Sequence, residues 1–95
     1  MKHHPLFEPP ATQQTKAGKV RLEPGESIGE HVTEHREEII IVLSGTATIT
    51  ANGQSTAVRA GNTYFIPVNT THNVTNRIQE PIEYIYVVTH FPHSH

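Results

Sequence analysis

Residues 29–45, GEHVTEHREEIIIVLSG, decide the fold of this chain. Two histidines and three glutamates fall within residues 31–38, and the apolar run of residues 39–43 follows directly. The run predicts a strand that is apolar on both faces and lies in the interior of the fold. An ionised carboxylate beside such a strand is costly unless something pairs with it, and a metal ion is one such partner. The first hypothesis is therefore a metal site at the start of a core strand.

The rest of the chain predicts about eight short strands and no helix. The expected strands are residues 19–23, 28–33, 38–43, 46–51, 54–58, 64–66, 72–77 and 82–89. Asn52-Gly53 lies between two of them and is the strongest short signal for a tight hairpin. Short strands at intervals of roughly ten residues indicate an all-β sandwich or barrel.

The sequence predicts a single domain with two irregular ends. The expected parts are an N-terminal arm over residues 1–15, a β-barrel over residues 16–90 and a tail over residues 91–95. Three prolines break regular structure in the arm. A second histidine group follows the last strand: His90, His93 and His95. For this group a solvated tail is favoured over a metal site, because a flexible segment orders no ligand geometry.

Composition excludes several classes of function. The chain has 95 residues, a net charge of −2 and no cysteine. Disulfides, thiolate metal sites and cysteine nucleophiles are therefore excluded, and the cytoplasm is the favoured compartment. The charge gives no support to a nucleic-acid partner, and no apolar stretch approaches the length of a membrane span. Eight histidines are many for such a chain, and histidine is the commonest metal-ligating side chain.

Two spaced motifs carry a family resemblance. In the first, His31 precedes Glu38, and Gly45 follows Glu38 after six residues. The second consists of Gly61, Pro67, His72 and Asn76, with Asn69 where the motif has a third-position glycine. Asparagine tolerates the left-handed backbone conformation that glycine often supplies there. In this order, on an all-β background, the motifs resemble those of the cupin family of small jelly-roll β-barrels.

The resemblance implies a metal site made by His31, Glu38 and His72. The second histidine of the family's first motif falls on Thr33, whose hydroxyl is expected to hold a bound water. His35 is a candidate replacement ligand, but four residues of straight strand separate it from His31 by about 13 Å. Both could reach one ion only if the chain bends at residues 33–34. Taken singly, the two family-matched histidines also fit a solvent-facing strand histidine and a hydrogen-bonded loop histidine.

Two imidazoles and one carboxylate form the ligand set of the facial triad, which leaves coordination positions open on Fe(II). The same set serves Mn, Ni, Co or Zn. The resemblance therefore implies a metal-binding protein that binds and transforms a small polar metabolite, such as a sugar, a sugar acid or an organic acid. The candidates for a general base are Tyr64, Tyr84, Glu37 and His35. The alternative is a non-catalytic binding or sensing module, and the fold does not select a reaction.

The last expected strand is apolar on both faces. Tyr84 and Tyr86 share one face, which is expected in the barrel core, and Ile85 and Val87 share the other. The second face fits contact with a partner subunit, so a homodimer is expected.

Overall fold

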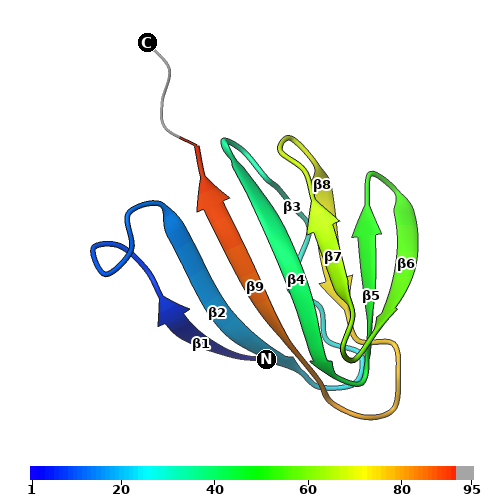
Figure 1. Cartoon of the computed structure of the whole chain (residues 1–95). Coiled ribbons are helices and arrows are strands. Elements are labelled where there is room, and N and C mark those ends of the chain that lie inside the picture. Colours follow the sequence, from blue (N-terminus) through cyan, green and yellow to red (C-terminus); the bar gives the residue numbers. More distant parts are fainter. Residues whose placement is uncertain (92–95) are drawn as a thin grey trace.

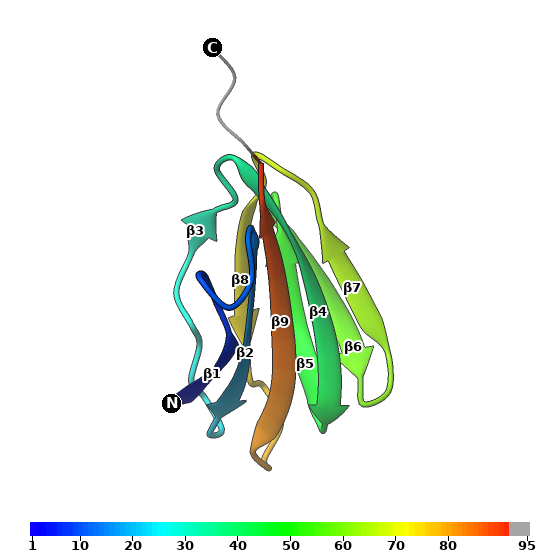
Figure 2. The same cartoon turned by 60° about the vertical axis from the view of Figure 1, so that its left-hand side comes forward.

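The computed structural model describes residues 1–91, which form nine strands in two facing antiparallel sheets (Figures 1 and 2). In spatial order the five-stranded sheet contains β1 (Lys2–Phe7), β2 (Thr15–Leu22), β9 (Ile82–His90), β4 (Arg36–Ser44) and β7 (Thr63–Ile66). The four-stranded sheet contains β3 (His31–Val32), β8 (Thr71–Thr75), β5 (Thr46–Ala51) and β6 (Gln54–Arg59). The expected all-β fold is confirmed. None of the described residues belongs to a helix long and apolar enough to cross a membrane.

The core lies between the sheets and is built from the inward faces of their strands, except for the exposed β1. Its fully buried members include Leu22, Ile40, Val42, Ala47, Ile49, Ile66, Val74 and Ile82. Full burial of one such aliphatic side chain contributes about 1.5–3 kcal/mol. The other face of β4 is open, since Ile39 and Leu43 each keep 43% of their surface exposed. The expectation that this strand is apolar and buried on both faces is therefore wrong for the single chain.

The N-terminal arm contains a strand that the sequence analysis did not expect. β1 pairs with β2 from Lys2 opposite Arg21 to Phe7 opposite Ala17, and the register shifts between Pro5 and Phe7. A proline lacks the N–H that a central strand needs, but an edge strand tolerates it. All six residues of β1 are exposed, so the strand is held mainly by its backbone pairing.

Two asparagines adopt the left-handed conformation that their positions require. Asn52 and Gly53 have φ angles of 49° and 82° in the hairpin between β5 and β6. Positive φ at both central residues is the geometry of a type I′ turn, which confirms the expected hairpin. Asn69 has a φ angle of 58°, so it does replace the motif glycine in conformation.

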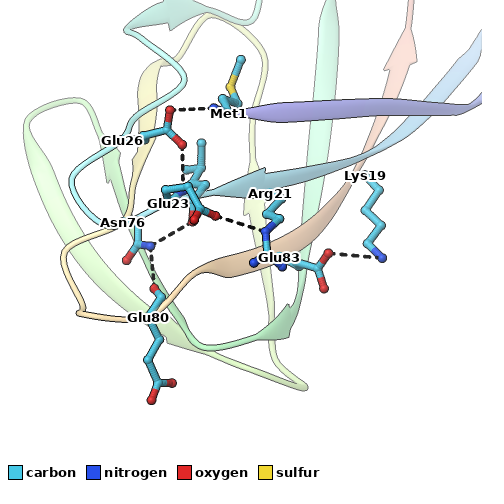
Figure 3. A network of polar contacts seen from close by, with 9 residues as sticks. Met1, Lys19, Arg21, Glu23, Glu26, Asn76, Glu80 and Glu83 are labelled. Carbon is cyan, nitrogen blue, oxygen red and sulfur yellow. Dashed lines mark hydrogen bonds and ion pairs between the residues drawn. The ribbon is translucent and has the colours of Figure 1, made fainter.

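Asn76 ties the end of β2 to the loop that follows β8 (Figure 3). Its buried side-chain amide donates hydrogen bonds to the carbonyls of Leu22 at 3.0 Å and Glu80 at 2.8 Å. Its side-chain oxygen accepts the N–H of Ile78 at 3.0 Å. These bonds satisfy backbone groups that no strand pairs, so this motif residue has a structural role at the end of the barrel away from His90.

Gly45 joins β4 to β5 where two constraints act at once. Its φ angle is 75°, and an added Cβ would lie 2.7 Å from Cγ2 of Ile82. We expect Gly45→Ala to lower the free energy of unfolding by about 2–5 kcal/mol, because it combines backbone strain with a core clash. Gly53→Ala is the matched control: its φ angle of 82° is similar but no atom lies within 4 Å of its added Cβ. The control should lose only about 1–2 kcal/mol in urea unfolding, and equal losses would contradict the packing argument.

Candidate metal centre

Three strands bring two histidines and one glutamate together between the sheets. His31 on β3 is the direct cross-strand partner of His72 on β8, and their ring centroids lie 4.1 Å apart. Glu38 reaches them from β4 in the opposite sheet, and its Oε1 lies 3.7 Å from Nε2 of His72. One candidate ligand atom from each residue lies within 4.8 Å of the other two. This is the spacing at which three side chains can bind a single ion.

A tight bend moves the chain from one sheet to the other. Residues 34 and 35 form a turn between β3 and β4, and His35 adopts a φ angle of 54°. The N–H of Glu34 donates to the carbonyl of Val32 at 3.0 Å. A bend at residues 33–34 was the condition for His35 to reach the ion together with His31, and the turn lies one residue later. It allows Glu38 to face His31 although seven positions separate them.

The backbone fixes the tautomer of both histidines. Nδ1 of His31 lies 3.0 Å from the carbonyl oxygen of Gly29, and Nδ1 of His72 lies 3.1 Å from that of Thr70. A carbonyl oxygen only accepts hydrogen bonds, so each Nδ1 must carry the hydrogen. Each Nε2 then keeps a free lone pair. Such carbonyl–histidine contacts are the usual way in which proteins orient imidazole ligands.

Burial acts on Glu38 and His72 in opposite directions. Burial raises the pKa of the Glu38 carboxyl from 4.5 to about 7, and the charge of Arg36 opposes part of the rise. Burial lowers the pKa of the His72 imidazole, which is therefore neutral at pH 7. The 3.7 Å contact between them is too long for a hydrogen bond, and a neutral imidazole makes no ion pair. Nε2 of His72 is consequently buried with no hydrogen-bond partner.

Thr33 holds the two histidine-bearing segments together. It is fully buried, and its hydroxyl donates to the carbonyl of Pro67 at 2.6 Å while it accepts the N–H of Thr70 at 3.0 Å. Its own N–H donates to the carbonyl of Thr70 at 3.2 Å, and its carbonyl accepts the N–H of Asn69 at 2.7 Å. The hydroxyl proton is thus committed to the backbone. The residue in the vacant ligand position is a structural clamp between β3 and the turn before β8.

The other residues considered from the sequence lie elsewhere. His35 is exposed and is not a member of the three-residue group, and its carbonyl accepts the N–H of Phe91 at 2.7 Å. Glu34 is exposed, and Glu37 lies on the opposite face of β4 from Glu38. Tyr64 packs against the core. The bend therefore separates His35 from the site instead of delivering it.

A cavity of about 340 Å³ lies beside His31 and Glu38. Its wall includes Tyr84 and Tyr86, whose expected shared face is confirmed. Four further lining residues were not assigned to a site by the sequence analysis: His3, Lys16, Arg36 and His90. The alternation of side chains along each strand could have predicted that Lys16, Arg36 and His90 line the cavity, because they continue the inward faces of β2, β4 and β9. The other two histidines of the tail group, at positions 93 and 95, lie outside the described residues.

Tyr86 forms one side of this cavity. Its ring lies directly over Gly18 on β2, where an added Cβ would come within 2.4 Å of the phenol oxygen. The phenol is hydrogen-bonded to Nε2 of His3, which comes from the N-terminal strand. Burial raises the pKa of both Tyr84 and Tyr86. Both phenols are therefore protonated near neutral pH and can donate hydrogen bonds, whereas neither is a ready base.

Comparison with known proteins agrees with the two motifs. The family described as Cupin domain matches residues 18–88, which is most of the chain. The protein belongs to the cupin family. The matched residues begin within β2, just after Lys16, and end within β9, just before His90. They include all three residues of the candidate metal site.

Solved cupins resemble the whole barrel. A protein from Thermus thermophilus superposes with a TM-score of 0.87 at 22% identity, over 97% of this chain and 85% of that one. A Cupin 2 conserved barrel domain protein from Salinispora arenicola superposes with a TM-score of 0.81 at 26% identity, over 93% and 74%. Among curated proteins, a mannose-1-phosphate guanylyltransferase from Salmonella typhimurium is 37% identical over 68 residues, or 72% of this chain and 14% of that protein. The chain spans 14–16% of the length of such curated relatives.

The pKa of Glu38 predicts how pH affects the metal-free protein. Between pH 4.5 and 7 the folded state keeps a Glu38 proton that the unfolded chain has released. The contribution of Glu38 to stability is therefore greatest below pH 4.5, and about 3 kcal/mol is lost as the pH rises through 7. His72 acts in the opposite sense, so the readout is the difference between Glu38→Gln and the wild type. That difference in unfolding free energy should grow in favour of the variant between pH 4.5 and 8, and a constant difference would refute the assignment.

Proposed function

We propose that this cupin binds a divalent first-row metal ion through His31, Glu38 and His72, and binds and transforms a small polar metabolite in the adjoining cavity. The observation that carries the proposal is the buried, unpaired Nε2 of His72, which lies 3.7 Å from a buried carboxylate oxygen. An unpaired polar atom in a core costs about 1–3 kcal/mol and is normally satisfied by a partner. A metal ion would be that partner.

The chemistry of the three residues fits an ion. Both imidazoles present Nε2 lone pairs, and Glu38 supplies the negative charge whose burial an ion would offset. Fe, Mn, Ni, Co and Zn all accept this mixed nitrogen and oxygen set, which does not select among them. Such an ion, when bound, polarises a carbonyl or carboxylate or activates a water molecule. The chain's own contribution is to hold the two rings through backbone carbonyls and to offer the protonated Tyr84 phenol as a hydrogen-bond donor.

The cavity suits a small metabolite. Its volume of about 340 Å³ lies at the lower end of the usual range for ligand sites, about 300–1,000 Å³. Val20 and Val88 supply apolar wall, and His31 and Glu38 are among the polar lining residues. The names of several curated relatives refer to mannose-1-phosphate, which is a sugar with an acidic phosphate group. These names support a sugar derivative or another small acid as the ligand. We therefore retain a sugar, a sugar acid or an organic acid as the ligand class.

A non-catalytic binding or sensing module is the second candidate. It is favoured by the small share of the curated relatives that the match covers, 16% and 14% in two of them. In those relatives the matched segment is a minor part of a larger protein, as a binding module would be. It is also favoured by the raised pKa of both cavity tyrosines, which removes them as bases. The two candidates differ in whether a bound metabolite is converted, and mass spectrometry of sugar acids and keto acids incubated with metal-loaded protein separates them.

We also propose that the protein forms a homodimer through the outer face of the five-stranded sheet. Apolar residues meet across three strands there: Ile39, Ile41 and Leu43 on β4, Phe65 on β7, and Ile85 and Val87 on β9. Phe65 keeps 53% of its surface exposed. A second copy would cover this face, which a single chain leaves in contact with water. The cytoplasm remains the proposed compartment, and the absence of cysteine from the sequence supports it.

Metal retention tests the proposed ligands. The protein purified without an affinity tag and supplied with Fe(II), Mn(II), Ni(II), Co(II) or Zn(II) should retain close to one ion per chain in elemental analysis. His72→Ala should reduce retention by at least about tenfold, because it removes one of three ligands. His35→Ala is the matched control and should retain the ion as the wild type does. Wild-type protein that retains none of these ions after dialysis would refute the metal site, and loss in the control would add His35 to the ligand set.

Light scattering with size exclusion tests the dimer. Phe65→Asp places a charge on the apolar face and should convert a dimer to a monomer, because desolvating an unpaired carboxylate costs several kcal/mol. Thr56→Asp lies on exposed β6 in the other sheet and should leave the dimer intact. A wild-type protein that is already monomeric at micromolar concentration would exclude the proposed interface.

A further inference from the structure

One end of the cavity carries positive charge from two strands. Lys16 lies at the start of β2 and Arg36 at the start of β4, and both line the cavity with His90 at the end of β9. β9 lies between the other two strands, so all three residues meet at one end of the five-stranded sheet (Figure 1). The register agrees, because Arg36 is the cross-strand partner of His90 and Lys16 pairs with the neighbouring Val88.

Neither of these two cations forms an ion pair with a described residue, whereas the two cations further along β2 do. Lys19 forms an ion pair with Glu83 at 3.4 Å, and Arg21 forms one with Glu23 at 3.1 Å (Figure 3). Within residues 1–91, neither Lys16 nor Arg36 has a carboxylate oxygen within 4.0 Å. The cavity-facing cations are therefore available to a ligand.

The guanidinium of Arg36 is already oriented. Its Nη2 donates a hydrogen bond to the carbonyl of Val32 at 3.1 Å, which directs the side chain toward β3. This contact uses one of five N–H donors, and the remaining donors suit the paired oxygens of a carboxylate or phosphate. The pKa of His90 is lowered by burial and then by Lys16 and Arg36, which is consistent with both cations lying near its ring.

The charges of the cavity favour an anion. Among the described residues that line it, Glu38 is the only carboxylate, against the two permanent cations. Positive charge in a concave site with apolar walls concentrates anions. Arg36 and Glu38 are two positions apart on one face of β4, so their backbones lie roughly 6.5–7 Å apart. A ligand only a few bonds long can therefore contact both the cations and the candidate metal ligands.

We infer that the ligand of this cavity is a small anionic metabolite whose carboxylate or phosphate is bound by Lys16 and Arg36 at this end of the cavity, while its other polar groups face His31 and Glu38. The inference deepens the proposed function and selects acids and phosphorylated compounds over neutral sugars. The contact of the ligand with His31 and Glu38 rests on the proposed metal site. The contact of its anionic group with the two cations does not require a metal.

Titration followed by ¹H–¹⁵N NMR tests the inference with three probes: malonate, inorganic phosphate and uncharged malonamide. Wild-type protein, both metal-free and loaded with diamagnetic Zn(II), should bind malonate or phosphate with shifts centred on the amides near residues 16, 36 and 90. The double variant Lys16→Gln/Arg36→Gln should weaken this binding by at least about tenfold, because it removes two charge-assisted contacts. Binding of malonate alone identifies a carboxylate ligand, and binding of phosphate alone identifies a phosphorylated one.

The matched control is Lys19→Gln/Arg21→Gln, which removes the same charge from β2 but from outside the cavity lining. It should bind the anions as the wild type does. The inference is overturned if malonamide binds as tightly as malonate, if neither anion binds, or if the control loses as much affinity as the cavity variant. Zinc content measured on the same samples separates the two proposals: retained zinc without anion binding refutes the inference alone, and anion binding without zinc refutes the metal site alone.

Discussion

The buried hydroxyl of Thr33 is the contact on which the site depends. It joins the segment that carries His31 to the turn that precedes β8 and His72, through the carbonyl of Pro67 and the N–H of Thr70. Both partners are backbone groups in a place where no regular strand pairing would satisfy them. A side chain that was first considered as a missing ligand therefore serves to hold the two retained histidines at ligand spacing.

The fold could be predicted because its signals are local. Alternating apolar residues and turn dipeptides such as Asn52-Gly53 depend only on neighbouring positions, and they gave all but one of the strands. β1 was missed because its pairing with β2 depends on backbone hydrogen bonds along an exposed edge, which leave no apolar pattern in residues 2–7. The second face of β4 was misjudged for a related reason. An apolar residue such as Ile39 does not reveal whether its cover comes from the same chain.

The candidate metal site could be predicted only in part from the sequence. Two motifs pointed to His31, Glu38 and His72, and the structure brings these together. The place of His35 depended on the backbone, since this residue lies with a left-handed φ angle in the two-residue turn and is not a member of the candidate ligand group. The cationic end of the cavity depended on register between β2, β9 and β4, which are far apart in the sequence. The period of two along each strand places Lys16 and Arg36 on inward faces, but only the register shows that both lie at the same end of the sheet.

A residue without a side chain governs the dimensions of the cavity. The ring of Tyr86 rests on Gly18, and the phenol is held there by His3 from the N-terminal strand. A single methyl group at position 18 would clash with this ring and force it to move. The shape of this cavity can therefore change through one backbone position, without any alteration to the histidines, the carboxylate or the cations, which would give the proposed ligand site a simple evolutionary route to new specificity.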